Sequence, residues 1–482
     1  MTQVRARWWA LYGLCAGVLM IVLDTTIVNV ALPSIREDLR FTQTSLVWVV
    51  NAYMLTFGGF LLLGGRLGDL FGRRRMFLLG VASFTLASLA CGAAGSQTLL
   101  IVARAAQGVA GAVVSAVALS LIMDLFTEPG ERAKAMGIYG FVCSAGGSIG
   151  VLLGGILTSA LNWHWIFLVN LPIGIAVYAF CRPRLPEASR AVPASGLDVA
   201  GAVTVTSALM LAVYAIVDAN RAGWASAQTI GSLAGTSLLL ALFLGIEAQA
   251  RAPLVPLALF RSRNTAIANV VGVLWAAAMF AWFFISALYL QRVLGYDALS
   301  VGLAFLPANL VMAAFSAGLS ARMVMRFGIR RPLAMGLLMA SAGLALFARA
   351  PADAMFTIDV LPAMLLLGLG AGIAFNPMLL AAMSDAEPRD SGLASGVVNT
   401  SFMMGGALGL AVLASLADAS STAALARGVP ATMAQNAGYH VAFAVGAVVA
   451  AVAALIGGAG IRTGARTVRR RRQRRSDTLE RT

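Results

Sequence analysis

Apolar stretches long enough to cross a lipid bilayer recur along the whole chain. A hydrocarbon core about 30 Å thick needs roughly 20 apolar residues in one helix, and the sequence holds fourteen such stretches. Their approximate bounds are 8–31, 46–66, 76–95, 99–124, 133–157, 164–181, 197–217, 229–249, 266–290, 299–321, 332–349, 358–383, 391–415 and 438–461. Only 11% of the residues are charged, against about 25% in soluble domains. The sequence therefore predicts an all-α integral membrane protein with fourteen transmembrane helices.

The basic residues gather on one side of the predicted membrane. With the N-terminus placed in the cytoplasm, 28 of the 35 Lys and Arg residues fall in the C-terminal tail and the alternate loops of that side, and 5 fall on the other side. Cytoplasmic loops of membrane proteins carry such an excess, so we expect a bacterial inner-membrane protein with both termini in the cytoplasm. The arginine-rich run at 469–475 then lies near anionic lipid. We expect no nucleic-acid partner, because no folded nucleic-acid-binding module accompanies the run.

Residues for enzymatic or metal chemistry are sparse. The four cysteines fall within predicted spans without the spacing of metal ligands, and the two histidines, His164 and His440, are far apart in sequence. The single lysine, Lys134, has no glycine-rich loop before it, which argues against a phosphate loop and ATP as the energy source. We expect no cofactor, no metal and no enzymatic activity, and an ion gradient as the energy source.

Two short motifs occur twice along the chain. The segment "LFGRRRMFLLG" at 70–80 has an echo in "RFGIRRPLAMG" at 326–336, and "GGSIG" at 146–150 has one in "GGALG" at 405–409. Both pairs are shifted by eight spans, which maps the first six spans onto the last six and leaves two unmatched. Parallel repeats of this kind indicate two bundles that rock about a site near the bilayer midplane.

The repeat divides the chain into four parts. We expect residues 1–182 to form an N-terminal six-helix bundle and 264–461 to form a C-terminal one. Residues 183–263 would be a linker with two additional transmembrane helices, and 462–482 would be a basic cytoplasmic tail.

Two charged residues lie deep within predicted spans. Asp24 is the only charged residue between Ala10 and Ile35, and Arg104 lies within the fourth span. At about 1.5 Å per residue, both lie roughly 9 Å from the outer edge of the hydrocarbon core, so the two side chains are level. Burial disfavours a carboxylate and a nearby arginine favours it. Two interpretations are open: Asp24 exchanges a proton during transport, or the pair is a permanent structural link.

The ninth span carries an aromatic and polar face. Trp275, Met279, Trp282, Ser286 and Tyr289 share one side of a helix by their three- and four-residue spacing. Such a face suits flat, lipophilic or cationic molecules if it lines a cavity, and it serves packing if it meets lipid. The residues expected to contact substrate are Asn51, Tyr53, Trp275, Met279, Trp282, Asn309 and Asn376.

The loop after the second span resembles a known signature. "GRLGDLFGRRR" at 65–75 is similar to the cytoplasmic loop motif of the major facilitator superfamily, in which the acid and the basic residues help to latch two helical bundles together. The resemblance implies a conformational latch with Asp124 as a partner. Its residues would be Gly65, Asp69, Gly72, Arg73 and Asp124. The second copy has Met325 in place of the acid, so an equivalent latch is not expected there.

Two further spans resemble signatures of proton-driven drug exporters in that superfamily. "LIVARAAQGVAGA" at 100–112 is similar to the motif that carries Arg104. "GGSIGVLLGGIL" at 146–157 is similar to the exporters' fifth-span motif, although Val151 stands where that motif has proline, so any bend must come from glycine. Small residues on one face let membrane helices approach closely. The expected packing and hinge residues are Gly146, Gly150, Gly154 and Gly155.

Segments 23–33 and 163–174 resemble the fourteen-span drug:proton antiporter branch. The resemblance implies a proton-coupled antiporter that exports lipophilic drugs or antibiotics, cationic ones included, by alternating access. The alternatives are a proton-coupled or facilitative metabolite transporter and, less favoured, a membrane-embedded enzyme. The expected partners are a small-molecule substrate, protons and membrane lipid, with the protein a monomer. The sequence identifies no accessory export protein.

Overall fold

The structure, a computed structural model, describes residues 3–42, 44–185, 198–250, 253, 255, 257–383 and 391–461. These residues form helices and their connections, and none of them lies in a β-strand. The all-α prediction is therefore confirmed. The predicted basic tail, 462–482, lies outside the described residues.

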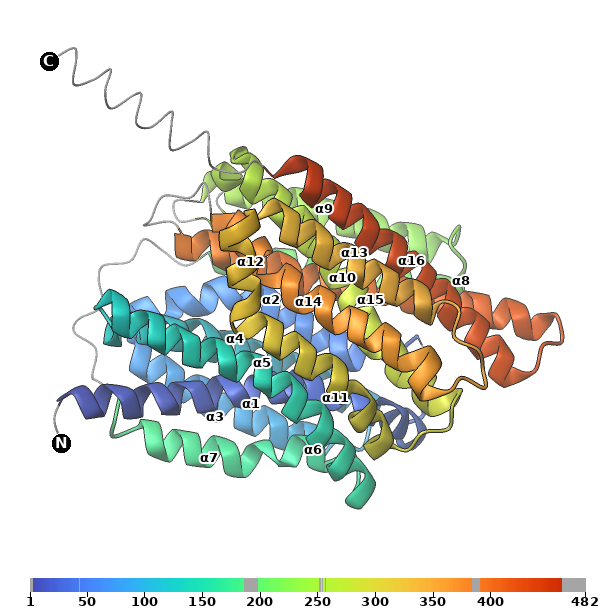
Figure 1. Ribbon diagram of the computed structural model, residues 1–482, viewed down its shortest axis with the longest axis horizontal. Coiled ribbons are helices and arrows are strands. Elements are labelled where there is room, and N and C mark those ends of the chain that lie inside the picture. Colours follow the sequence, from blue (N-terminus) through green and yellow to red (C-terminus); the bar gives the residue numbers. More distant parts are fainter. Residues whose placement is uncertain are drawn as a thin grey trace, which may run out of the picture.

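The first group of helices is drawn in blue to teal in Figure 1. It consists of α1 (Gln3–Asp38), α2 (Val47–Phe71), α3 (Arg73–Gly92), α4 (Gln97–Leu125), α5 (Pro129–Ala160), α6 (Trp165–Leu168) and α7 (Asn170–Cys181). Two green helices follow, α8 (Val199–Ala222) and α9 (Ala227–Gln249).

The second group runs from yellow to red in Figure 1. It consists of α10 (Arg263–Arg292), α11 (Ala298–Ala314), α12 (Ser320–Phe327), α13 (Arg330–Phe347), α14 (Leu361–Met383), α15 (Ser391–Ala426) and α16 (Ala431–Gly460). A 3-10 helix, η1 (Leu257–Arg261), precedes α10, and the π-helical turns η2 (Phe315–Leu319) and η3 (Phe356–Val360) precede α12 and α14.

Length and hydropathy make this a multi-pass membrane protein. Within the described residues, ten helices are long and apolar enough to cross a bilayer. Shorter apolar helices accompany them over Ile149–Ala160, Trp165–Cys181 and Ala298–Ala314.

The two groups pack their helices in the same pattern. In the first, α2 and α3 contact α4, and α1 contacts α5; in the second, α11 and α13 contact α14, and α10 contacts α15. The repeated loop motif also has a common backbone geometry. Gly72 (φ 91°) separates α2 from α3, and Gly328 (φ 75°) separates α12 from α13, and glycine adopts such angles without steric cost. The internal repeat seen in the sequence is thus a repeat of structure.

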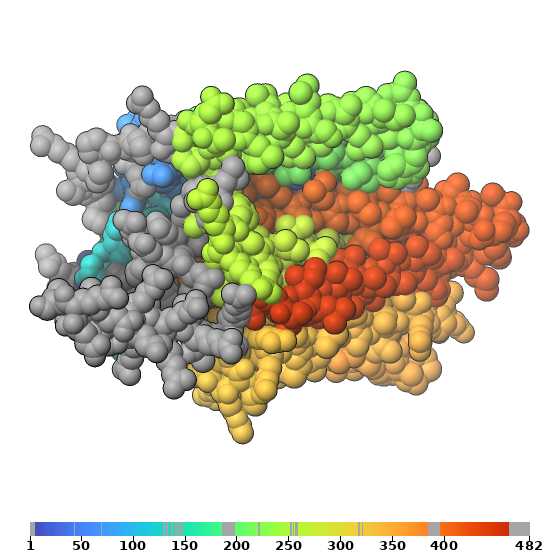
Figure 2. Space-filling model, turned by 90° about the horizontal axis from the view of Figure 1, so that it is seen from above, coloured from blue at the N-terminus to red at the C-terminus, as the bar shows by residue number. Residues whose placement is uncertain are grey.

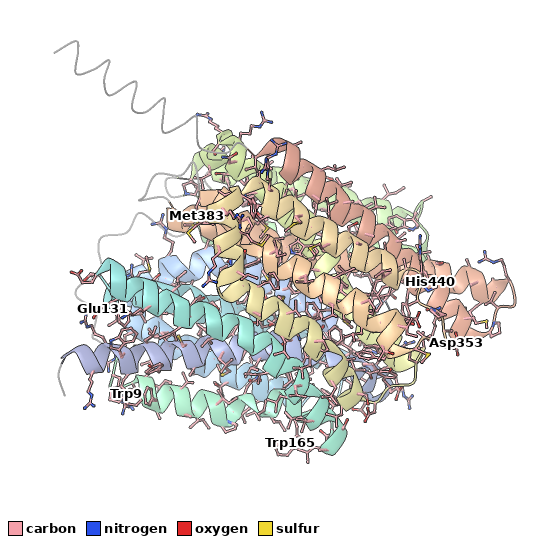
Figure 3. The ribbon with its side chains drawn as sticks, viewed as in Figure 1. Trp9, Glu131, Trp165, Asp353, Met383 and His440 are labelled. Carbon is pink, nitrogen blue, oxygen red and sulfur yellow. The ribbon has the colours of Figure 1, made fainter. Side chains whose placement is uncertain are left out.

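The helix ends gather at two opposite ends of the molecule. Trp165, Asp353 and His440 lie at one, here called the Trp165 end, and Glu131 and Met383 lie at the other, the Glu131 end (Figure 3). This division is the alternation expected of a chain that crosses a membrane repeatedly.

Arginines at the Glu131 end bind the last carbonyl groups of helices. The side chain of Arg74 donates to the carbonyl of Arg182 at 2.6 Å, and that of Arg263 donates to Gly460 at 3.0 Å. Cations stabilise the negative end of a helix dipole. These basic residues therefore have a structural task besides their contribution to topology.

The helices α8 and α9 lie along one flank of the molecule, shown in green in Figure 2. α8 contacts α2 and α15, one helix from each group, and α9 packs against α8. α9 leaves large apolar side chains exposed, with Leu238 72% and Leu242 50% accessible. Contact with lipid accounts for such a surface.

The sixth predicted span differs from its expected form. The sequence predicts one helix over 164–181, whereas the structure has α6 and α7 separated at Val169. Pro172 lacks the N–H that would reach the carbonyl of Leu168, which weakens the helix at that turn. The interruption lies beside the candidate site described next.

Candidate functional site

Asp24 and Arg104 form a buried ion pair. Arg104 Nη1 lies 2.5 Å from Asp24 Oδ2, and the two side chains are 1% and 0% exposed. The structure thus brings together the two residues that the depth estimate placed level. Charges within a membrane span are costly unless they are paired or face water, and here each supplies the counter-charge of the other.

The second carboxylate oxygen of Asp24 is held by two amides. Gln107 Nε2 donates to Oδ1 at 2.7 Å, and Asn170 Nδ2 donates to it at 3.0 Å. The same two amides donate to Ser88 Oγ at 3.2 and 2.9 Å, and Ser88 Oγ donates to the carbonyl of Phe167 at 2.9 Å. We call Asp24, Arg104, Gln107, Asn170 and Ser88 the Asp24 network. It joins α1, α3, α4 and α7.

Arg104 has further partners on α2. Its Nε donates to the carbonyl of Val49 at 3.0 Å, and its guanidinium carbon lies 4.4 Å from the centre of the Tyr53 ring. Close helix contact makes this reach possible: a Cβ at Gly108, one turn after Arg104, would lie 2.4 Å from the carbonyl of Tyr53. The "RAAQG" segment therefore contains the cation (Arg104), an amide (Gln107) and the glycine that lets α2 approach closely (Gly108).

Sequence reasoning did not single out Ser88, Gln107 and Asn170. Their signal was an uncharged polar side chain within an apolar span, and such residues are common in membrane helices. Gln107 had the stronger signal, because it lies three residues after Arg104 on the same helical face.

The glycines of α5 pack against α1 around Asp24. A Cβ at Gly150 would lie 2.9 Å from the carbonyl of Leu23, and one at Gly154 would lie 2.6 Å from that of Ile27. Gly146 faces the side chain of Val22 in the same way. Gly155 instead faces the second group, where its Cβ would lie 2.7 Å from the carbonyl of Ala298.

Replacing Gly154 with Ala is expected to lower the thermal stability of the purified protein. Its Cβ would press on backbone that cannot move without separating α1 from α5, and overpacking of this kind costs about 1–3 kcal/mol. Gly147→Ala is the matched control, because a Cβ there meets nothing within 4 Å. Thermal unfolding in detergent measures both, and equal midpoints would contradict the close contact.

The second group repeats this helix pair without its charges. Two glycines of α15 approach two residues of α10, as Gly146 and Gly150 approach Val22 and Thr26 of α1. The contacting pairs are Gly405 with Val273 and Gly409 with Ala277. Trp275 follows Val273 by two residues, as Asp24 follows Val22, so Trp275 occupies the position that Asp24 has in the first group. The acid–arginine site is therefore a feature of the first group.

The predicted substrate residues fall in separate places. Tyr53 lies beside Arg104, and its hydroxyl is buried without a hydrogen-bond partner among the described residues. Asn51 Nδ2 donates to the carbonyl of Ala407 at 3.0 Å and so links α2 to α15, while its buried Oδ1 has no partner in the part of the chain that the structure describes. Asn376 is half-buried and donates to the carbonyl of Ser316 at 3.2 Å.

The other predicted substrate residues lie on α10 and α11. Trp275 and Trp282 are 1% exposed, and Met279 is half-buried. Trp282 packs against Phe305 of α11, with ring centres 6.1 Å apart. Within the described residues, Trp282 Nε1 and Asn309 Nδ2 are both buried without a hydrogen-bond partner.

The face of α11 that carries Asn309 also meets the first group. Gly302, seven residues earlier and thus on the same face, approaches the carbonyl of Val151 on α5, where its Cβ would lie 3.0 Å away. Asn309 is therefore on the side of α11 that is turned toward the other group.

The latch residues lie at the Glu131 end of α2, α3 and α4. Arg73 forms an ion pair with Asp124, the partner that the sequence suggested. This pair joins α3 to α4 within the first group, and both side chains are partly exposed, so its own contribution is about 0–1 kcal/mol. Gly65 and Gly72 lie in the same region, and the side chain of Asp69 is outside the described residues.

The two groups are joined at the Trp165 end. Gln291 Nε2 of α10 donates to the carbonyl of Val30 on α1 at 2.9 Å, and Arg292 lies 3.3 Å from Glu37. The amide of Leu299 donates to Ser159 Oγ of α5 at 3.2 Å. These contacts would have to separate if the groups moved apart at this end.

A bundle of membrane helices with internal repetition and a buried ion pair has the architecture of a secondary transporter. The chain belongs to the major facilitator superfamily, which it matches over residues 14–410. It is 40% identical to the puromycin resistance protein pur8 of Streptomyces alboniger, over 87% of this chain and 84% of that protein. It is 37% identical to the cephamycin export protein CmcT of Amycolatopsis lactamdurans, over 89% and 88%.

Solved structures show the same fold. A peptide transporter of the POT family, in complex with sulfate, aligns with a TM-score of 0.68 over 93% of each chain, at 17% sequence identity. At this identity the likeness concerns the fold alone.

Proposed function

We propose that this protein is a proton-coupled antiporter that exports lipophilic drugs or antibiotics, cationic ones included, by alternating access. The observation that carries the proposal is the buried Asp24–Arg104 ion pair in a chain whose relatives include a resistance protein and an export protein.

The proposed architecture is two six-helix bundles with two additional helices between them. The proposal takes α6 and α7 as one span, joins α11 to α12 through η2 and η3 to α14, and so counts fourteen spans among the described helices. The matching contacts within the two groups support bundles at 1–182 and 264–461. The proposed linker at 183–263 contains the additional pair, of which α8 contacts both α2 and α15 and α9 packs against α8.

The proposed orientation places the Glu131 end in the cytoplasm of a bacterial cell. The excess of Lys and Arg on that side supports it. In this orientation the proposed latch of Arg73, Asp124 and Asp69 lies at the cytoplasmic face, where Arg73 and Asp124 join α3 to α4, and the ion pair of Arg292 with Glu37 joins the two groups at the outer face.

In the proposed cycle Asp24 is protonated from outside and deprotonated toward the cytoplasm, and substrate binds in the deprotonated phase. The deprotonated phase of this scheme agrees with the geometry, in which Arg104 and two amides donate hydrogen bonds to the carboxylate of Asp24. When water reaches the network from one side, the balance between burial and pairing changes, and a proton can bind. The competing account is an ion pair that stays charged throughout and only holds α1 to α4.

Substrate recognition is proposed for the region around Trp282 and Asn309. An unpaired buried donor costs about 1–3 kcal/mol, and both residues carry one. An acceptor oxygen on a bound molecule would satisfy such a donor. Trp282 and Phe305 bring aromatic rings to this region, and such rings pack favourably with flat apolar molecules.

Drug accumulation in a bacterial host that lacks its own exporters tests the function. Cells that express the protein should hold less puromycin or ethidium than cells with the empty vector, and a protonophore should remove the difference because it collapses the proton gradient. A difference that persists with the protonophore would contradict proton coupling. Equal accumulation of every drug in a broad panel would contradict export itself.

A further inference from the structure

Hydrogen-bond donors are divided unequally between the two oxygens of Asp24. Oδ1 accepts from Gln107 at 2.7 Å and from Asn170 at 3.0 Å, whereas Oδ2 accepts only from Arg104, at 2.5 Å, among the described residues. A carboxylate oxygen has about two lone-pair sites. While both amides stay in place, Oδ1 has no site left for a proton.

The two amides are themselves held in position. Both donate to Ser88 Oγ, which donates to the carbonyl of Phe167 near the break between α6 and α7. Ser88 and Gln107 are fully buried, and Asn170 is 1% exposed. An amide that turned its oxygen toward Asp24 would lose its bond to Ser88 as well as the one to Oδ1.

Arg104 is held differently, because much of its binding does not involve Asp24. It donates to the carbonyl of Val49 at 3.0 Å and to Gln107 Oε1 at 2.8 Å, and it lies over the Tyr53 ring at 4.4 Å. A guanidinium that loses its carboxylate would keep these partners. The ring contact would then matter more, because no counter-charge competes for the cation.

We propose that Gln107, Asn170 and Ser88 are positioning residues that keep Oδ1 of Asp24 occupied by amide donors, so that Oδ2 takes the proton. The protonated carboxyl group no longer carries the charge that attracts Arg104, so the guanidinium moves away from Asp24 while Asp24 stays in place. The inference rests on the proposed proton coupling. The proton comes from water on one side of the membrane and leaves to water on the other. The pair changes from neutral to singly positive and back.

The displaced arginine acts on the helix that meets the other group. Arg104 binds Val49 and Tyr53 of α2, and Asn51, which lies between them, donates to the carbonyl of Ala407 on α15. Because Arg104 keeps these two contacts, a shift of its guanidinium away from Asp24 moves the part of α2 that lies within one turn of a bond between the two groups. Proton binding at Asp24 is thereby coupled, through Arg104 and α2, to the contact between the two groups.

Few titratable groups surround Asp24. Among the described residues these are Arg104 on α4, Tyr53 on α2 and Cys91 on α3, whose thiol lies 3.5 Å from Gln107 Oε1. Around Asp24, the described part of α5 places glycines against α1, and α7 places the uncharged Asn170. A pH profile that responds to the network therefore reports on Asp24.

The pH dependence of drug export by the purified, reconstituted protein tests the proposal. Asn170→Leu removes a donor from the charged carboxylate, so proton uptake becomes easier and the midpoint of the profile should rise by about one to two pH units. Asn436→Leu is the matched control, because Asn436 is also buried and donates to the carbonyl of Ala350 in the second group. Its midpoint should stay at the wild-type value.

A variant that acts on Arg104, and not on Asp24, should shift the midpoint in the opposite direction. Tyr53→Leu removes the ring that supports the displaced cation, so proton uptake becomes harder and the midpoint should fall. Tyr53→Phe keeps the ring and should shift the midpoint less. If Asn170→Leu fails to fold, Ser88→Ala should raise the midpoint by a smaller amount. Its control is Ser341→Ala, because the Ser341 hydroxyl donates to the carbonyl of Ala447 in the second group.

An unchanged midpoint in Asn170→Leu, or shifts of the same sign in Asn170→Leu and Tyr53→Leu, would overturn the inference. Loss of proton-driven export in Asp24→Asn together with an unchanged midpoint in Asn170→Leu would refute the positioning role alone. Proton-driven export that survives in Asp24→Asn would refute the proposed coupling itself.

Discussion

Replacing Asp24 with Asn is expected to abolish proton-driven drug export and to leave a folded protein in the membrane. Asparagine has nearly the same size and shape, so α1 and α5 keep their contact, but its amide cannot exchange a proton in the physiological range. Arg104 would keep its bonds to Val49 and Gln107. Efflux from cells under an imposed pH gradient measures the loss, and thermal unfolding of the purified variant checks the fold.

A second acid within a membrane helix provides the control for this substitution. Asp418 lies half-buried on α15, outside the Asp24 network. Asp418→Asn is expected to retain proton-driven export. If Asp24→Asn retained it as well, the ion pair would be a structural link and the proton would bind elsewhere.

Replacing Arg104 with Met is expected to destabilise the protein by about 3–5 kcal/mol, because it leaves the carboxylate of Asp24 buried without a counter-charge. Methionine fills a similar volume, so the loss concerns charge more than packing. The effect should appear as a large drop in thermal stability near neutral pH. The double variant Arg104→Met, Asp24→Asn should recover part of it, because no buried charge remains.

An exposed ion pair offers the comparison. Arg292 and Glu37 lie 3.3 Å apart, but their side chains are 20% and 76% exposed, and Arg292→Met should cost only about 0–1 kcal/mol. Equal losses in the two arginine variants, or no recovery in the double variant, would show that burial does not set the energy of the Asp24–Arg104 pair.

The ion pair could be predicted from the sequence because charged residues are rare in membrane spans and their depth follows from helix rise. Its neutral partners could not. Ser88 and Asn170 come from different helices, and the sequence does not determine how each helix is rotated about its axis. Asn170 also depends on the break at Val169, which the prediction of one span over 164–181 did not include.

Hydropathy predicted the presence of membrane helices better than the ends of those helices. The first span was expected over 8–31, whereas α1 extends over Gln3–Asp38, because polar turns beyond the lipid core continue a helix without raising hydropathy. The glycines of the fifth span were expected to give close packing, and the structure adds their partner, α1 around Asp24. The separation of the substrate residues into different places reflects packing between distant segments, which spacing along one helix does not reveal.

Proton movement coupled to drug movement tests the central claim most directly. The purified protein is reconstituted into vesicles that hold a pH-sensitive dye, and an outward gradient of an exported drug is applied without a pH gradient. We expect wild-type vesicles to take up protons as drug leaves, and Asp24→Asn vesicles to show no drug-dependent proton uptake. Drug-dependent proton uptake of equal size in both would contradict the account.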